Sequence, residues 1–286
     1  MLALDPSIVV EYQRYLMSAK LTEPKCVAKF FIQGTTRLDG DDDHTRRLNV
    51  DNVVGQNLGD GINTFQAKDE TLDVHLDVIV EHCPRDRLLS ANIVTWRGIL
   101  TAIMCHPYSN QRDDIDSFNA ICQDGVVFIE HDKSSKLTRQ SDPKFTYYGF
   151  RFETICMERQ KDKTKDTITN NTIEWTHIIS SSIDDLSLIY GAEVDGIDDG
   201  PACELVELKT SRAIQTERDR HLFMKRKIMK TWAQSYLANV PNIVYGFRDD
   251  DGVIVDLQRY RLHDLPNLAK DAGWDLKVML EFLKQS

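Results

Sequence analysis

The feature that most limits how this chain can fold is a pair of alternating segments on either side of a short turn. Residues Ile189 to Ile197 and Cys203 to Thr210 alternate apolar with polar side chains, and Asp198-Asp199-Gly200-Pro201 lies between them. A period of two is typical of β-strands, and a cluster of Asp, Gly and Pro is typical of a turn. The two segments are therefore predicted to form a β-hairpin with a slightly long turn.

The predicted hairpin gathers charged side chains on one face, because residues two apart on a strand share a face. Glu193 and Asp195 project together, with Val194 facing away. Glu207 and Lys209 also project together. Clustered carboxylates repel one another unless a cation lies between them, and hard divalent cations prefer oxygen ligands. The pattern predicts a metal site whose lysine can hold a phosphate oxygen or an attacking water.

The alternative is that these side chains are solvent-facing charges paired as cross-strand salt bridges. For the Glu207-x-Lys209 pair alone this alternative is favoured, since such a pair is common by chance. It weakens because Glu193 and Asp195 are like charges on the same face, with only one nearby cation from the hairpin.

The remaining patterns predict a mixed α/β fold in a single domain spanning residues 1–286. We expect a twisted mixed β-sheet, a second antiparallel sheet and flanking helices. Helices are predicted at residues 5–20, Leu72 to Cys83, Thr216 to Ala238 and Trp274 to Leu283. Strands are predicted at Asn92 to Trp96, Val126 to Ile129, Ile243 to Phe247 and Val253 to Leu257, with Ile99 to Cys105 continuing the apolar pattern of the first.

Three less regular segments complete the prediction. Residues 34–63 are rich in Gly, Asp and Asn and are predicted to be irregular. Phe145 to Met157 is expected to begin extended and to become helical near Phe152. Arg159 to Asn171 is nearly all polar and is predicted to form a solvated surface loop.

The composition argues against several classes of protein. A net charge of −10 does not favour attraction of nucleic acid to the whole surface, so a polyanion would have to bind locally in a cleft. The six cysteines are far apart, which argues against a zinc site or a disulfide framework and indicates reduced thiols in an intracellular protein. No signal peptide or bilayer-spanning apolar stretch is visible, so we expect a soluble protein without a membrane partner.

Further motifs add polar side chains to those of the hairpin. Gly149 to Glu153 ends an aromatic-alternating stretch with an acid, and Arg97 directly follows a predicted strand. Gln234 lies on the long predicted helix, where helical spacing places it on one face with Lys227 and Lys230. Each has an ordinary alternative: Arg97 as a surface salt bridge and Gln234 as a helix-face residue. The neighbouring Trp96 and Trp232 are predicted to be core residues.

Asp195 followed by Glu207-x-Lys209 resembles the signature of the PD-(D/E)xK nuclease superfamily. With the other motifs, the chain resembles the decapping exonuclease (DXO) family, which includes nuclear decapping partners of 5′–3′ exoribonucleases. That family carries, in order, an arginine motif, a G-φ-x-φ-E motif, an E-φ-D motif and an E-φ-K motif, where φ is apolar. Over about residues 72–260 these match Arg97, Gly149 to Glu153, Glu193 to Asp195, and Glu207 to Lys209, with Gln234 matching a glutamine on the following helix.

The resemblance implies a set of ligands for Mg²⁺ or Mn²⁺. Glu153, Asp195 and Glu207 would ligate the metal directly, and the Leu208 carbonyl would add one ligand. Removing Asp195 or Glu207 is expected to stop turnover, because a metal ligand is lost. Since the two are like charges, folding is expected to stay intact or to improve.

The resemblance also implies roles around the metal. Glu193 would act in catalysis through a metal-bound water. Lys209 and Gln234 would hold the scissile phosphate, as both catalytic and substrate-binding residues. Arg97 would contact the RNA backbone.

The activity implied by the resemblance is hydrolysis at RNA 5′ ends that lack a proper methylated cap. The expected products are pyrophosphate from 5′-triphosphate RNA, an unmethylated cap dinucleotide, or a nicotinamide-dinucleotide (NAD) cap, and some members also degrade RNA 5′ to 3′. Two alternatives stay open: a PD-(D/E)xK DNA nuclease, and a weakly catalytic or non-catalytic scaffold that stabilises a 5′–3′ exoribonuclease. The expected location is nuclear or cytoplasmic.

Overall fold

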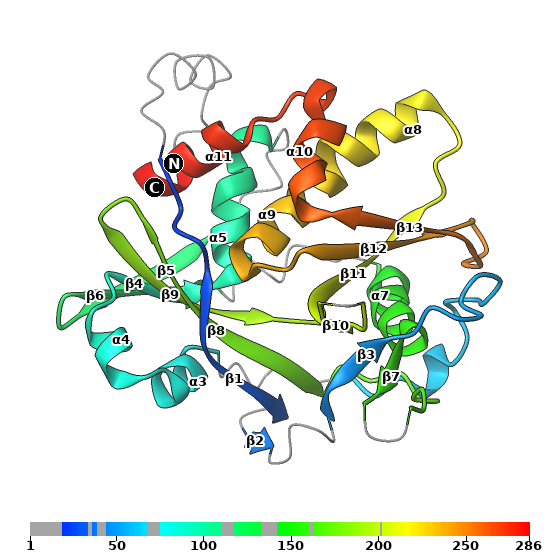
Figure 1. Ribbon diagram of the computed structural model, residues 1–286, viewed down its shortest axis with the longest axis horizontal. Coiled ribbons are helices and arrows are strands. Elements are labelled where there is room, and N and C mark those ends of the chain that lie inside the picture. Colours follow the sequence, from blue (N-terminus) through cyan, green and yellow to red (C-terminus); the bar gives the residue numbers. More distant parts are fainter. Residues whose placement is uncertain are drawn as a thin grey trace.

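The computed structural model describes residues 19–33, 36–38, 44–67, 75–109, 117–132, 142–160, 163–200 and 202–286. Its strands form two mixed sheets, with helices packed between and around them (Figure 1). Most of the predicted helix at residues 5–20 lies outside the described residues, as do residues 72–74.

The first sheet, sheet A, has seven strands. They are β1 (Lys25–Gln33), β2 (Thr36–Leu38), β4 (Ile93–Trp96), β5 (Phe118–Gln123), β6 (Val126–His131), β8 (Ile173–Ile183) and β9 (Leu186–Glu193). Their order is β2-β1-β8-β9-β4-β6-β5. β4 runs parallel to both of its neighbours, β9 and β6, so its carboxyl end meets the carboxyl end of β9 at one edge of the sheet.

The second sheet, sheet B, has six strands. They are β3 (Arg46–Leu48), β7 (Met157–Arg159), β10 (Gly196–Asp198), β11 (Glu204–Arg212), β12 (Asn242–Arg248) and β13 (Ile254–Arg261), in the order β13-β12-β11-β10-β3-β7. The expectation of an antiparallel second sheet is wrong, because β11 and β12 pair in parallel, as do β10 and β3. A helical crossover joins β11 to β12, and such a crossover returns the chain in the same direction.

Several helices cover the sheets. They are α3 (His75–His82), α4 (Arg85–Leu89), α5 (Arg97–Cys105), α7 (Pro143–Cys156), α8 (Glu217–Leu222), α9 (Met229–Ala238), α10 (Leu265–Leu268) and α11 (Leu276–Gln285). A π-helix, η3 (Phe223–Ile228), joins α8 to α9, and 3₁₀ turns lie at η1 (Ile62–Thr64), η2 (His106–Tyr108), η4 (Leu262–Asp264) and η5 (Lys270–Ala272).

The long helical segment between β11 and β12 follows the sequence prediction. Thr216 and Asp219 form a reciprocal capping box at its start, and Asn239 ends it in the left-handed conformation at φ 52°. The predicted hairpin of β12 and β13 is also confirmed, since the two strands pair antiparallel. The C-terminal helix is confirmed as α11, capped by Asp275.

Two of the predicted segments differ from the structure. Ile99 to Cys105 belongs to α5 rather than to a strand, because the apolar run buries Ile99, Leu100 and Met104 on one side of a helix. The segment from Phe145 is helical from its start to Cys156, since the Asp142 side chain caps α7 and Pro143 occupies its first turn. The alternation of aromatic side chains had suggested an extended start, but the segment forms a helix.

The two polar segments also hold more order than expected. Residues 34–63 include the short strands β2 and β3 and part of η1. In the segment 159–171, Arg159 is the last residue of β7, and Thr169 is buried.

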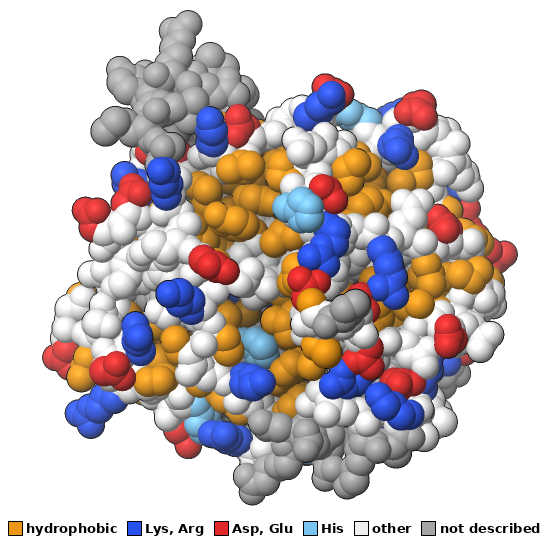
Figure 2. Space-filling model, viewed as in Figure 1, with side chains coloured by type: hydrophobic (Ala, Val, Ile, Leu, Met, Phe, Trp, Pro, Cys, Tyr) orange, Lys and Arg blue, Asp and Glu red, His pale blue; other side chains and the backbone are white. Residues whose placement is uncertain are grey.

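The surface of the molecule mixes charges of both signs. Acidic and basic side chains are interspersed over the face seen in Figure 2, in keeping with a net charge of −10. All six cysteines are free thiols, as expected. Among the described residues no helix is long and apolar enough to cross a membrane.

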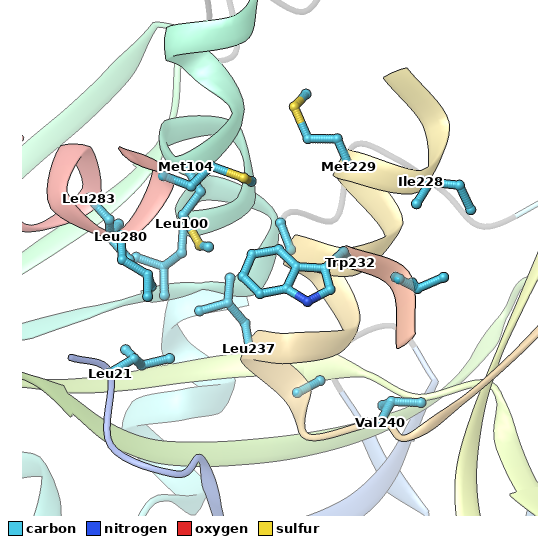
Figure 3. Packing of buried hydrophobic residues seen from close by; sticks show 14 of the residues in the cluster. Leu21, Leu100, Met104, Ile228, Met229, Trp232, Leu237, Val240, Leu280 and Leu283 are labelled. Carbon is cyan, nitrogen blue, oxygen red and sulfur yellow. The ribbon is translucent and has the colours of Figure 1, made fainter. Parts of the chain in front are cut away.

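The largest core cluster joins sheet A, β12 of sheet B and the helices α5, α9 and α11 (Figure 3). Trp232 of α9 lies in the middle of the view in Figure 3, and Leu100 of α5 and Leu280 and Leu283 of α11 lie on one side of it in the same cluster. This core confirms Trp232 as a core residue. It also fixes α5 and α9 against sheet A, and the N-terminus of α5 and the middle of α9 border the pocket described below.

Candidate active site

The candidate site lies where the chain passes from sheet A to sheet B. β9 ends at Glu193 in sheet A, and β10 begins at Gly196 in sheet B. The predicted hairpin is therefore only partly correct: β10 pairs with β11, whereas Ile189 to Glu193 pairs with β8 and β4. The alternation predicted strands and faces but carried no information on which sheet each half joins.

This crossing leaves part of β11 without a neighbouring strand on one side. β10 pairs with β11 only as far as Val206, opposite Gly196. Beyond that point the Leu208 N–H donates to Asp195 Oδ2 at 2.6 Å. The N–H and C=O of one strand residue point to the same side, so the Leu208 carbonyl also faces this open edge.

Glu207 lies at the centre of the site, with 1% of its surface exposed. Arg97, the first residue of α5, donates from Nη1 to Glu207 Oε2 at 3.2 Å, and the Lys209 ammonium bonds Glu207 Oε1. Burial alone would raise the pKa of Glu207, but Arg97 and Lys209 lower it to about 2. Glu207 also contributes to raising the pKa of Lys209 against the effect of burial. The alternative of Arg97 as a surface salt bridge is wrong, because Arg97 is 9% exposed.

For the other three acids, burial and neighbouring carboxylates outweigh the nearby cations. Burial, and next the carboxylates of Asp195 and Glu193, raise the pKa of Glu153 well above its usual range. Burial and Glu207 raise the pKa of Asp195 to about 6. Glu193 is exposed at the pocket, yet the pocket walls surround its carboxylate. The resulting desolvation of the carboxylate, together with the charge of Glu174, raises the pKa of Glu193. The site holds more carboxyl groups than cations, and the raised pKa values mean that a bound cation would favour the charged forms of these acids.

The side chains are not arranged around an ion. Within the described ranges, no three His, Cys, Asp or Glu side chains are placed to hold a metal directly. Asp195 accepts from Leu208, and Glu207 accepts from Arg97 and Lys209. Both Glu207 oxygens already accept from a cation, so a metal ion would share or replace these partners, and the oxygen-rich donor set fits a hard divalent cation.

Glu153 reaches the site from α7, which packs directly on sheet B. The Phe152 ring lies on Gly246 of β12, where a Cβ would be 2.4 Å from Phe152 Cε2. Only glycine allows this approach, so the helix backbone comes close to β11. Glu153, the next residue, is thereby placed among the carboxylates of Asp195, Glu193 and Glu207.

A pocket of about 330 Å³ adjoins these residues. Arg97, Glu193 and Gln234 all line it, so the structure brings these predicted residues together. Trp96 is half-buried and lines the pocket rather than the deep core, with its ring so close to Gly191 that a Cβ there would lie 2.5 Å from Cζ3. The remaining lining residues are Leu76, Asp77, Gly98, Ile99, Glu130, His131, Glu174 and Ala192.

Lys227 and Lys230 do not join Gln234 in the pocket lining. Lys227 lies in the π-helix η3 and donates to the Thr210 carbonyl at 3.1 Å, and Lys230 is exposed. The wider π turns of η3 interrupt the expected α-helical spacing between Lys227 and Gln234, whereas Lys230 and Gln234 both lie on α9 and keep it.

The acids Asp77, Glu130 and Glu174 of the pocket wall were not anticipated from the sequence. They come from three separate elements, α3, β6 and β8, and no local spacing connects them. Only the packing of sheet A places them opposite Glu193.

Asp195 directly before β10, followed by Glu207 and Lys209 two apart on β11, matches the signature of the PD-(D/E)xK nucleases. The family described as RAI1 like PD-(D/E)XK nuclease matches residues 22–286, and the chain belongs to this family. This confirms the resemblance that its motifs predicted.

Curated relatives agree with the family. The decapping nuclease RAI1 of Aspergillus fumigatus is 31% identical over 274 residues, covering 84% of this chain and 72% of the relative. The decapping nuclease RAI1 of Neurospora crassa is 32% identical over 274 residues, covering 84% of this chain and 64% of the relative.

Solved structures show the same fold. Candida albicans Rai1 in complex with pU5-Mn²⁺ has a TM-score of 0.77 at 19% identity, covering 93% of this chain and 81% of that chain. Scheffersomyces stipitis Rai1, in complex with (3′-NADP)⁺ and calcium ion, has a TM-score of 0.76 at 22% identity, covering 93% of this chain and 80% of that chain. K. lactis Dxo1 in complex with manganese has a TM-score of 0.68 at 18% identity, covering 94% of this chain and 81% of that chain. The predicted mixed α/β fold is confirmed.

Proposed function

We propose that this chain is a Mg²⁺- or Mn²⁺-dependent hydrolase of RNA 5′ ends that lack a proper methylated cap. The observation that carries the proposal is the excess of confined carboxylates beside Lys209, next to a pocket lined by Arg97 and Gln234. The family supports it, since the relatives compared above are named decapping nucleases. So do the pU5-Mn²⁺ and (3′-NADP)⁺ ligands of the two Rai1 structures.

The proposed metal ligands are Glu153, Asp195, Glu207 and the Leu208 carbonyl. A bound divalent cation supplies a Lewis acid that activates water and offsets charge on the phosphate. The raised pKa values of Glu153 and Asp195 support this role, because a cation would favour their charged forms. The open edge at Leu208 supports the fourth ligand.

The remaining residues act on the substrate in this proposal. Lys209 carries its charge firmly, because the acids around it raise its pKa, and it holds a phosphate oxygen in the transition state. Gln234 donates to the same phosphate from α9. Glu193 orients the attacking water, and its raised pKa favours acceptance of a proton near neutral pH. Arg97 offsets the charge of the RNA backbone in the pocket.

The test is a panel of RNAs that differ only at the 5′ end, incubated with Mg²⁺ or Mn²⁺, with products identified by mass. The 5′ ends are triphosphate, unmethylated cap, NAD cap and methylated cap. We expect release of pyrophosphate or of an intact cap dinucleotide from the unmethylated substrates, with loss of activity in EDTA and in Asp195→Asn. A matched panel of 2′-deoxy substrates is tested beside it: equal cleavage of the two panels would favour a DNA nuclease, and metal-independent release would contradict the proposal.

We also propose that the chain acts as one domain and associates with a 5′–3′ exoribonuclease in the nucleus or cytoplasm. The support is the family resemblance of its motifs. Co-purification with an exoribonuclease, compared between wild type and the inactive Asp195→Asn, tests association independently of catalysis.

A further inference from the structure

The ammonium group of Lys165 is bound entirely by main-chain carbonyls. Lys165 Nζ donates to Ile155 O at 2.8 Å, to Asn49 O at 2.7 Å and to Asp51 O at 3.2 Å. An ammonium group has three donors, so all of them are used. These carbonyls belong to the last turn of α7 and to the loop at residues 49–51.

The bond to Ile155 closes the C-terminal end of α7. The last carbonyls of a helix have no partner within the helix and need one from elsewhere. Here the Glu153 carbonyl accepts from the Met157 N–H, Ile155 from Lys165, and Cys156 from the Asn49 N–H at 2.7 Å. A positive charge at this end is also favoured by the helix dipole.

The loop at residues 49–51 begins a segment, 49–66, that lies along α7 (Figure 1). Its side chains Val53 and Leu58 are fully buried in the cluster that contains Phe152. Further on, the Leu58 N–H donates to the Gly252 carbonyl at 2.9 Å in the turn after β12. The segment is therefore anchored to sheet B, and Lys165 ties the end of α7 to this anchor.

The same end of α7 carries Glu153, which the carboxylates of Asp195, Glu193 and Glu207 repel. Glu153 lies two residues before Ile155, and its own carbonyl takes part in the helix end. Repulsion of its side chain acts on the last turn of α7, the part that Lys165 holds.

We propose that Lys165 is a positioning residue that holds the last turn of α7 and thereby keeps Glu153 in place to ligate a divalent metal. The inference rests on the proposed function, in which Glu153 is a ligand. Lys165 itself touches neither metal nor substrate in this proposal.

The test is calorimetric titration of Mn²⁺ into metal-free protein, comparing wild type, Lys165→Met and Lys163→Met. The control removes the same charge from the same loop, but Lys163 is exposed and its ion pairs with Glu158 and Asp199 are 3.8 Å long. We expect Lys165→Met to weaken Mn²⁺ binding about tenfold or more, the scale seen for partners that orient metal ligands, and the control to bind as wild type. Equal affinities in all three proteins would overturn the proposal.

A double-mutant cycle separates positioning through Glu153 from general loss of structure. In a Glu153→Gln background, Lys165→Met should cause no further loss of Mn²⁺ affinity. Additive losses would overturn positioning through Glu153. Wild-type affinity of Glu153→Gln itself would instead contradict the proposed ligand set, so the two failures are distinguishable.

Lys165→Arg keeps the charge and serves if the methionine variant does not fold. A planar guanidinium fork does not match three carbonyls arranged around one ammonium, so we expect an intermediate Mn²⁺ affinity. If Lys165→Arg bound Mn²⁺ as tightly as the wild type, the three bonds that converge on the Lys165 ammonium would not be needed, and this part of the proposal would be overturned.

Discussion

Glu207 and Asp195 carry the same charge in the same site, yet they have opposite environments. Glu207 lies between Arg97 and Lys209, which lower its pKa to about 2. Asp195 accepts one N–H bond from Leu208, and burial raises its pKa to about 6. From the sequence alone the two acids are equivalent, and the fold was expected to tolerate the loss of either. The structure separates them.

Removal of Glu207 should destabilise the metal-free protein, unlike removal of Asp195. Glu207→Ala leaves Arg97 buried without its partner, and breaking such a pair costs about 3–5 kcal/mol. Asp195→Asn keeps an oxygen for Leu208 and removes a repelled charge, so stability should stay equal or rise. Chemical denaturation in EDTA measures both. Equal destabilisation by the two changes would contradict this distinction.

Lys209 should act mainly in the transition state. Lys209→Ala is expected to lower kcat about a hundredfold or more, the scale for one lost electrostatic donor, with a smaller effect on Mn²⁺ affinity. Lys209→Arg should rescue poorly, because a planar fork replaces a compact charge. Steady-state kinetics and metal titration measure the split, with the exposed Lys230→Ala as control. An arginine variant at the wild-type rate would reduce Lys209 to an ion-pair partner of Glu207.

At the scale of elements, the site depends on how closely α7 approaches sheet B. The helix contributes Glu153. The contact between the Phe152 ring and Gly246 sets the distance between the helix and the sheet. The C-terminal turn of α7, three residues further on, is held by Lys165. A helix held at both points places one carboxylate among three others despite their repulsion.

Gly246→Ala should therefore push α7 away from the site. The new Cβ would clash with the Phe152 ring, at a cost of about 1–3 kcal/mol for overpacking, with weaker Mn²⁺ binding. Gly149→Ala is the matched change within α7, because nothing lies within 4 Å of its Cβ position. It should stabilise the helix by about 0.5–1 kcal/mol. Thermal unfolding compares the two, and a neutral Gly246→Ala would show that α7 is not held by this contact.

For the whole molecule, the site joins two sheets that local structure does not connect. Sheet A supplies Glu193, sheet B supplies Glu207 and Lys209, and Asp195 lies on the link between them. A cation bound at this junction would connect both sheets and offset part of the local negative charge. Metal should therefore affect the stability of the entire protein.

Mn²⁺ should raise the melting temperature more at pH 8 than at pH 5. The pKa of Asp195 rises from 3.8 to about 6 on folding, so its contribution to stability is present below pH 3.8 and is lost as pH rises through 6. Glu153 shifts in the same direction. A metal binds the charged forms, so at high pH it offsets this loss, whereas at low pH protons compete. Melting curves with EDTA or Mn²⁺ across this range measure the difference, and a pH-independent effect of Mn²⁺ would contradict it.

The sequence by itself determined several strands near the site, the long helical segment after β11 and the motif residues, but not the full extent of the helices α5 and α7. Thr216 and Asn239 marked the ends of the long helix, and the alternation at Glu207 marked the face of β11. These features are local, because capping and alternation depend on neighbouring residues. The family and nuclease class followed from the same motifs and are confirmed.

Only the tertiary structure decided which elements meet. Alternation in Ile189 to Ile197 gave no sign that its two halves join different sheets, since both halves have the same period of two. The Lys165 bonds and the acids of the pocket wall join residues far apart in sequence, and no local pattern encodes such contacts. The opposite charge environments of Asp195 and Glu207 likewise depend on Arg97, which reaches Glu207 only because α5 is packed against sheet A.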